Sequence, residues 1–222
     1  MDYRFLAETL AFKPSLFQAM LLFNRDMAAP LPDELSALGE PFASLWNSPS
    51  FRRSWPDLPT ERGYWNFSEE SQRMALLPPA VVARLGLFLS AAVHAEELSR
   101  VIARDAVLEL RRALGADIVS YALKRGRYQI GSLRNSLLVP SAFGSLPLRV
   151  KLLAVAAPSL ISEGWPDELR RLAEPRFPRL TDETDAKRFE PALEREQRRA
   201  LWFTMKKLLL REVAPEWAPC FD

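Results

Sequence analysis

The single histidine of the chain, His94, lies three residues before Glu97 in the run His-Ala-Glu-Glu. Residues three apart on a helix are neighbours on one face. An imidazole beside a carboxylate can act as an acid–base pair, or it can supply half of a metal site. The alternative is a structural histidine at a helix end, bonded to a carboxylate or a carbonyl. We favour this alternative because no spacing in the sequence supplies the other half of a metal or catalytic site.

Residue counts and missing motifs exclude several kinds of site. One histidine excludes a His-Glu-x-x-His centre and a two-histidine iron site. One cysteine, Cys220, excludes an intramolecular disulfide and a multi-cysteine metal site. The chain has no Gly-x-Ser-x-Gly motif, and Gly126 and Gly131 lack the Lys-Ser/Thr of a phosphate-binding loop. We therefore expect no catalytic residue, no metal ligand, no cofactor-binding residue and no cofactor.

Four basic residues cluster around Tyr128, namely Lys124, Arg125, Arg127 and Arg134. Basic side chains with an interleaved aromatic can contact a nucleic-acid backbone and stack on a base. However, 30 basic and 28 acidic residues leave a formal net charge of only +2. Such a balance lends little affinity for nucleic acid at physiological salt. Three interpretations stay open, in decreasing order of support: a solvated helix end and loop, a surface for an acidic protein partner, and a nucleic-acid contact.

Large aromatic residues are frequent in the region before residue 68. Trp46, Trp55 and Trp65 all lie there. Such side chains can hold an irregular segment onto a helical core, which is the interpretation we favour. They are also enriched in protein interfaces. We therefore keep these three tryptophans, with the four basic residues, as candidate partner-binding residues.

The composition is that of an ordinary globular protein, with 48% hydrophobic and 26% charged residues. The longest uncharged run of the central region, residues 85–93, is much shorter than the roughly 20 apolar residues of a membrane-spanning helix. The apolar stretch 15–23 resembles a signal-peptide core, but Asn24-Arg25-Asp26 follow where small residues are expected. We expect a cytoplasmic protein with no direct membrane insertion.

Prolines divide the chain into three parts. Six of the 18 prolines fall within residues 30–59, and none lies between residues 80 and 139. Because proline removes a backbone donor and clashes with the preceding turn, the stretch 30–59 can hold only short helices and turns. We predict a single helical domain over 1–222. It has a proline- and aromatic-rich lead over 1–67 that packs on the core, central helices over 68–139 and proline-interrupted helices over 140–222.

Helical periodicity dominates the central and final parts. Apolar residues recur every three or four positions over 81–93, and the phase slips near Ala95, which predicts a helix break. Gly115 and Gly126 each follow basic residues, which predicts two helix ends. Pro191 is expected to open a last helix that runs to about Val213.

Strand signals are weak. The best candidates are the short runs 128–130 and 137–139. The predicted fold class is therefore all-α, with at most one or two very short strands. The expected architecture is a compact orthogonal or antiparallel helical domain with an irregular N-terminal lead.

Three segments carry a resemblance to a known family. They are Leu85-Gly86-Leu87-Phe88-Leu89, Arg100-Val101-Ile102, and the run from Leu110 to Leu123. They resemble the SctK (YscK-like) family of bacterial type III secretion systems. Members of that family carry a leucine–glycine–leucine helix, an arginine–isoleucine step and a leucine–glycine turn that leads into an aromatic–alanine–leucine helix. The basic apolar run from Lys206 to Pro215 is also similar to the closing helix of the family.

The resemblance implies a helical, non-enzymatic cytoplasmic scaffold of the sorting platform, peripheral to the inner-membrane base of the injectisome. Such proteins link the cytoplasmic domain of the inner-membrane ring protein (SctD) to the pod protein (SctQ), and through it to the stator and ATPase. The lead and the His94–Glu97 stretch match no part of the family pattern. The alternatives are a small helical enzyme that uses His94 and Glu97, and a nucleic-acid-associated regulator that uses Lys124–Arg134; we expect no nucleic-acid partner.

Overall fold

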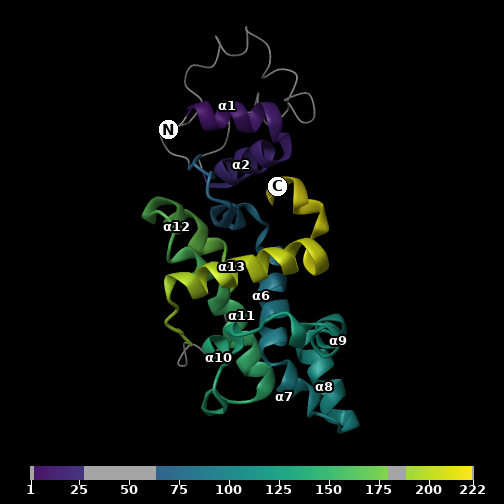
Figure 1. Cartoon of the computed structure of the whole chain (residues 1–222). Coiled ribbons are helices and arrows are strands. Elements are labelled where there is room, and N and C mark those ends of the chain that lie inside the picture. Colours follow the sequence, from purple (N-terminus) through teal and green to yellow (C-terminus); the bar gives the residue numbers. More distant parts are fainter. Residues whose placement is uncertain (1–2, 28–63, 180–188, 222) are drawn as a thin grey trace. The chain divides into compact units, whose positions relative to one another are not determined.

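The computed structural model describes residues 3–27, 64–179 and 189–221 (Figure 1). All regular secondary structure in these ranges is helical, which confirms the all-α prediction. The two strand candidates are wrong. Residues 126–128 form a 3-10 turn, η2 (Gly126–Tyr128), and Leu137 ends helix α10 (Leu133–Leu137). Tyr128 is exposed, but Ile130, Leu137 and Val139 are buried and Leu138 is half-buried, so packing against helices rather than strand pairing explains most of the pattern.

The chain divides into two compact units. The first comprises Met1–Leu76 together with Ala218–Asp222, and the second is the continuous stretch Leu77–Trp217. This division differs from the three parts expected from the prolines, because the last residues group with the first part of the chain.

The first unit contains α1 (Tyr3–Phe12), α2 (Pro14–Met27), the 3-10 helix η1 (Glu70–Leu76) and α14 (Ala218–Phe221). Its apolar core includes Phe23 and Phe67, whose rings meet edge to face with centroids 5.6 Å apart. Because these residues lie far apart in the sequence, the packing of their rings ties the segment before η1 to α2.

Buried polar side chains fix the backbone of the first unit. The Arg73 guanidinium donates to the carbonyls of Phe67 and Cys220 at 3.1 and 3.0 Å. The Asn24 amide donates to the carbonyl of Tyr64 at 2.9 Å. Each bond satisfies a buried carbonyl, and together they hold the segment before η1 and the helix α14 in place.

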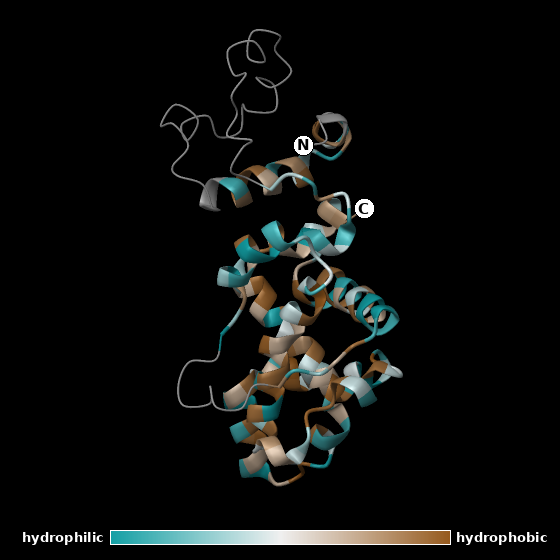
Figure 2. Cartoon of the chain, turned by 90° about the vertical axis from the view of Figure 1, so that its left-hand side faces the viewer, coloured by the Kyte–Doolittle hydropathy of each residue, from teal (hydrophilic) through white to brown (hydrophobic). Residues whose placement is uncertain are grey.

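The second unit is built on longer helices. They are α6 (Pro79–Val93), α7 (Ala95–Ser99), α8 (Arg104–Leu114), α9 (Ala116–Lys124), α11 (Leu146–Ser162), α12 (Asp167–Ala173) and α13 (Arg195–Leu208). Short turns complete it: η3 (Ser141–Phe143), η4 (Glu174–Arg176), the π-helical turn η6 (Leu209–Val213) and η7 (Pro215–Trp217). Apolar residues gather where these helices face one another (Figure 2).

Several helix ends lie where the sequence predicts them. The break predicted near Ala95 occurs at His94, between α6 and α7. Gly115 ends α8 with φ 101°, a backbone conformation that favours glycine. The last long helix begins at Arg195 rather than at Pro191. Its first turn is closed by a capping box between Glu194 and Gln197, which moves the start four residues along the chain.

The helices α6 and α11 pack closely against each other at Gly86. A Cβ atom at this position would lie 2.2 Å from the carbonyl oxygen of Ala154. That distance is far inside van der Waals contact with backbone, so only glycine fits without moving a helix. The leucines on either side of this contact, Leu85, Leu89 and Leu153, are fully buried. The α6–α11 pair is therefore the centre of the second unit.

We predict that Gly86→Ala destabilises the protein by about 2–3 kcal/mol or more, because the added methyl group forces the two helices apart. The measurement is the urea midpoint followed by near-ultraviolet circular dichroism. Gly164→Ala is the matched control, since the nearest atom there is 3.9 Å from the added Cβ. Equal stability of the two variants would contradict the proposed close packing.

Candidate functional site

His94 is fully buried at the junction of α6 and α7. Its Nδ1 lies 2.9 Å from the carbonyl oxygen of Ser90, one turn earlier, so the ring donates a hydrogen bond into α6. Burial lowers the pKa of the imidazole from its ordinary value of 6.5, because a charged ring is poorly solvated there. The ring is therefore neutral at physiological pH, and no solvent reaches it.

The carboxylate of Glu97 is held by Arg149 of α11. The guanidinium donates to both carboxylate oxygens, at 2.6 and 3.0 Å, and to the carbonyl of Val139 at 3.1 Å. Arg149 is 7% exposed. The hydrogen bond from Arg149 holds the pKa of Glu97 below its usual value.

The two candidate acid–base groups thus have structural partners. The carboxylate of Glu97 is engaged by Arg149, and the imidazole of His94 is sealed among core residues. A general base has to reach a substrate proton, directly or through one water. The arrangement favours a structural role for His94 over a catalytic one, in line with the interpretation favoured from the sequence.

Arg134, one of the four basic candidates, also stabilises this junction. Its Nε donates to the carbonyl of Val93 at 3.2 Å, and its Nη2 lies 2.6 Å from the carboxylate of Glu96. The carbonyl of Val93 belongs to the last turn of α6, where helical partners run out. Arg134 therefore satisfies the helix end and is not a projecting basic residue.

The remaining basic candidates lie where α9 meets η2. Arg125 forms an ion pair with Glu212 at 3.0 Å. The guanidinium of Arg127 stacks on the ring of Tyr128, 4.4 Å from its centroid, and Tyr128 is 71% exposed. Lys124 is exposed and makes no ion pair with any described residue.

We call Leu123, Lys124, Arg127 and Tyr128 the α9 corner. Gly126 lies within this corner and is buried against Ala92 of α6, which fixes the position of the corner on the second unit. The structure therefore divides the basic segment: Lys124 and Arg127 project beside an exposed aromatic ring, whereas Arg125 and Arg134 bind acidic residues of this chain.

The tryptophan candidates are placed only in part. Trp46 and Trp55 lie outside the described residues. Trp65 belongs to the first unit and is 7% exposed, which favours core packing over partner contact.

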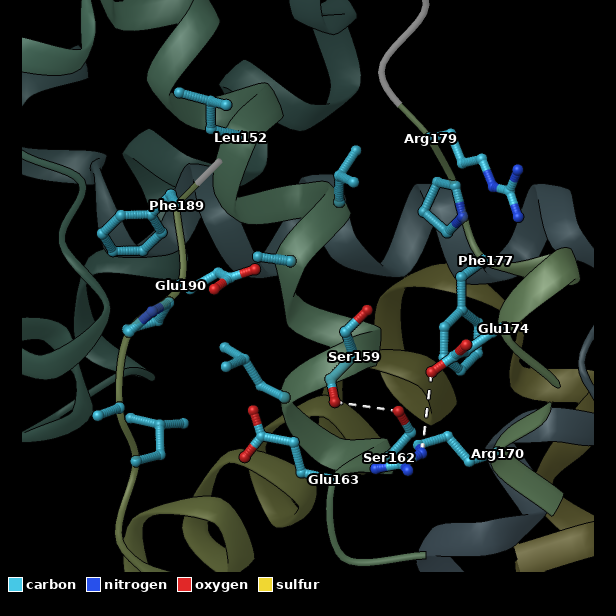
Figure 3. Close-up of a pocket in the computed structure, with 17 residues that line it drawn as sticks. Leu152, Ser159, Ser162, Glu163, Arg170, Glu174, Phe177, Arg179, Phe189 and Glu190 are labelled. Carbon is cyan, nitrogen blue, oxygen red and sulfur yellow. Dashed lines mark hydrogen bonds and ion pairs between the residues drawn. The ribbon is translucent and has the colours of Figure 1, made fainter. Parts of the chain in front are cut away.

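The second unit contains a cleft of about 920 Å³ that the sequence did not reveal (Figure 3). It is lined by one face of α11, by α12 and η4, and by the segment before α13. Arg170 pairs with Asp167 at 2.8 Å, and Glu163 pairs with Arg198 at 2.8 Å. Ser162 donates to the carbonyl of Ser159. Because acidic and basic groups neutralise one another here, the lining does not select a ligand of one charge.

Neither a metal centre nor a reactive thiol emerges from the described part of the chain. No three His, Cys, Asp or Glu residues within it lie close enough together to hold a metal ion. Cys220 is buried, and burial raises the pKa of its thiol, which suppresses the reactive thiolate.

Comparison of the chain with models of known families, with curated proteins and with solved structures found no match. Within the described ranges, no helix combines the length and the apolar character needed to cross a bilayer.

We predict that stability falls as pH drops from 8 to 5, mainly through His94. The folded-state pKa of His94 is lowered, so the unfolded chain binds a proton first, at about pH 6.5 and below. For a single group the loss is at most about 1.4 kcal/mol per pH unit below that value. His94→Asn keeps a donor near Ser90 but does not titrate, and its free energy of unfolding should be nearly independent of pH in this window. The prediction fails if the wild-type profile is flat or the variant retains the slope.

We also predict that Arg149→Leu lowers the free energy of unfolding by about 3 kcal/mol, because it leaves a half-buried carboxylate and a buried carbonyl without their donor. Arg170→Leu removes an exposed ion pair on α12 and should cost less than about 1 kcal/mol. Urea unfolding at pH 7 compares the two, and similar losses would contradict the role assigned to Arg149.

Proposed function

We propose that this chain is a non-enzymatic scaffold of the type III secretion sorting platform. It links the cytoplasmic domain of the inner-membrane ring protein (SctD) to the pod protein (SctQ), and through it indirectly to the stator and ATPase. Its place is in the cytoplasm, peripheral to the inner-membrane base of the injectisome. The proposal rests on the resemblance of the central block to the SctK family.

One structural observation supports this proposal most directly. The leucines and the glycine of the first segment that carries the resemblance lie at the packing centre of the second unit, whereas Arg100 and Ile102 of the second segment are exposed. Leu85 and Leu89 are fully buried, and the glycine between them, Gly86, is the site where α6 meets the backbone of α11. The leucine–glycine turn of the pattern is the α8–α9 junction, where Leu114 is buried and Gly115 adopts a positive φ. These leucines and glycines of the resemblance thus have roles in helix packing and at a helix end.

A scaffold acts by holding binding surfaces on rigid elements. We propose that the α9 corner meets an acidic surface of one partner. Lys124 and Arg127 supply the positive charge, and Tyr128 supplies an exposed aromatic ring of the kind that anchors protein interfaces. Its support on α6 through Gly126 keeps the corner in a fixed orientation.

The test of the scaffold is binding of the purified full chain to the cytoplasmic domain of the ring protein (SctD) and to the pod protein (SctQ) of the same bacterium. Isothermal titration calorimetry and size-exclusion chromatography measure binary and ternary complexes. We expect both proteins to bind at the same time. Failure of the folded chain to bind either protein would overturn the proposal.

Charge reversal at the α9 corner provides a second prediction. Lys124→Glu/Arg127→Glu should slow association with one of the two partners about 10-fold at low salt and weaken its salt dependence. Arg111→Glu/Arg112→Glu on the exposed side of α8 is the control with an equal change of charge. Equal association rates of the two variants in stopped-flow measurements would show that the α9 corner is not part of the interface.

A further inference from the structure

The outward face of α13 carries a second cationic and aromatic surface. Leu201, Trp202 and Met205 of this helix are buried. Phe203 points to the other side and is 52% exposed, although it is a large apolar residue. Arg199 and Lys207 lie one turn before and one turn after it, on the same face. We call these three residues the α13 face.

The charge on this helix is arranged with one sign. From residue 197 to residue 211 every charged residue is basic, whereas the acidic residues Glu194 and Glu196 are confined to the start of the helix. Lys207 and Arg211 are exposed and form no ion pair with any described residue. The guanidinium of Arg199 lies 5.6 Å from the centroid of the Phe203 ring. The face thus presents uncompensated positive charge on both sides of an exposed ring.

We propose that the α13 face binds an acidic helical segment of a partner protein. The complementary segment places an apolar side chain against Phe203 and a carboxylate about one turn to either side of it. One turn of four residues rises about 6 Å, so the two carboxylates meet Arg199 and Lys207 when the two helices lie side by side. Burial of the Phe203 ring by the apolar contact excludes water from the flanking ion pairs, which strengthens them.

The composition of the face distinguishes a protein from other anionic partners. A helix that binds a lipid surface needs a broad apolar side, whereas Phe203 is the exposed large apolar residue of α13. A nucleic acid is held by many phosphate contacts, and two cations about 12 Å apart supply few. An acidic helix matches both the charge and the single central ring.

This inference extends beyond the proposed function, because it follows from α13 alone and names no injectisome component. It concerns a surface separate from the α9 corner. Two such surfaces on one unit are what a protein that joins two partners requires.

The test uses the full chain and labelled helix-forming 21-residue peptides, measured by fluorescence anisotropy. The acidic peptide has a central leucine with glutamates four residues before and after it. A second peptide has lysines in place of the glutamates, and a third has the acidic composition in scrambled order. We expect the wild-type chain to bind the acidic peptide at least 10-fold more tightly than either of the others.

Variants assign the binding to the face. Phe203→Ala should weaken binding of the acidic peptide about 10-fold. Arg199→Glu/Lys207→Glu should reverse the preference, so that the lysine peptide binds more tightly. Ile102→Ala, which removes an exposed apolar side chain of another segment, and Arg111→Glu/Arg112→Glu should bind as the wild type does.

The inference is overturned if the wild-type chain does not discriminate among the peptides, or if the control variants lose affinity as strongly as the α13 variants. It is also overturned if the Arg199/Lys207 variant instead loses binding to a 20-nucleotide RNA or to vesicles with 30% anionic lipid. Thermal unfolding followed by circular dichroism verifies that each variant is folded.

Discussion

The buried pairing of Arg149 with Glu97 is the interaction on which the second unit depends. It joins α11 to α7, and through the carbonyl of Val139 it also fixes the segment before α11. A buried guanidinium is tolerated only when acceptors meet it, and here a carboxylate and a carbonyl do so. Burial is the main cause that lowers the pKa of the nearby His94, and the positive charge of Arg149 lowers it further, so the imidazole stays neutral. The helix break is therefore stabilised by polar groups that have little capacity left for chemistry.

Ion pairs within the chain also explain why the basic residues between Lys124 and Arg134 do not form one continuous surface. Arg134 neutralises the acidic residue beside the break and bonds the end of α6, whereas Arg125 is engaged by Glu212. What projects from the second unit is a pair of smaller surfaces, each with an arginine stacked on an exposed ring: Arg127 on Tyr128, and Arg199 on Phe203. The first of these surfaces lies on the turn η2 after α9, and the second lies on α13.

The sequence correctly predicted those helix ends that depend on interactions between residues close together in the chain. The phase slip near Ala95 and the position of Gly115 located helix ends correctly, because hydrophobic periodicity and left-handed glycine act within a few residues. The strand candidates failed because short apolar runs can also supply buried side chains from turns and helix ends, as Ile130, Leu137 and Val139 do. The pairing of Glu97 with Arg149 could not be predicted, since the two residues are 52 positions apart and both would ordinarily be exposed. The cleft beside α11 was missed for the same reason: distant segments form it.

The connectivity of the two units has a mechanical consequence. The second unit is an uninterrupted stretch of chain, and both of its ends lead back into the first. A pulling force applied between the two ends of the polypeptide is therefore borne by the contacts that hold α14 in the first unit. Among these is the hydrogen bond from Arg73 to the carbonyl of Cys220. While that bond and the packing around it survive, the second unit carries no tension and its outward faces keep their geometry.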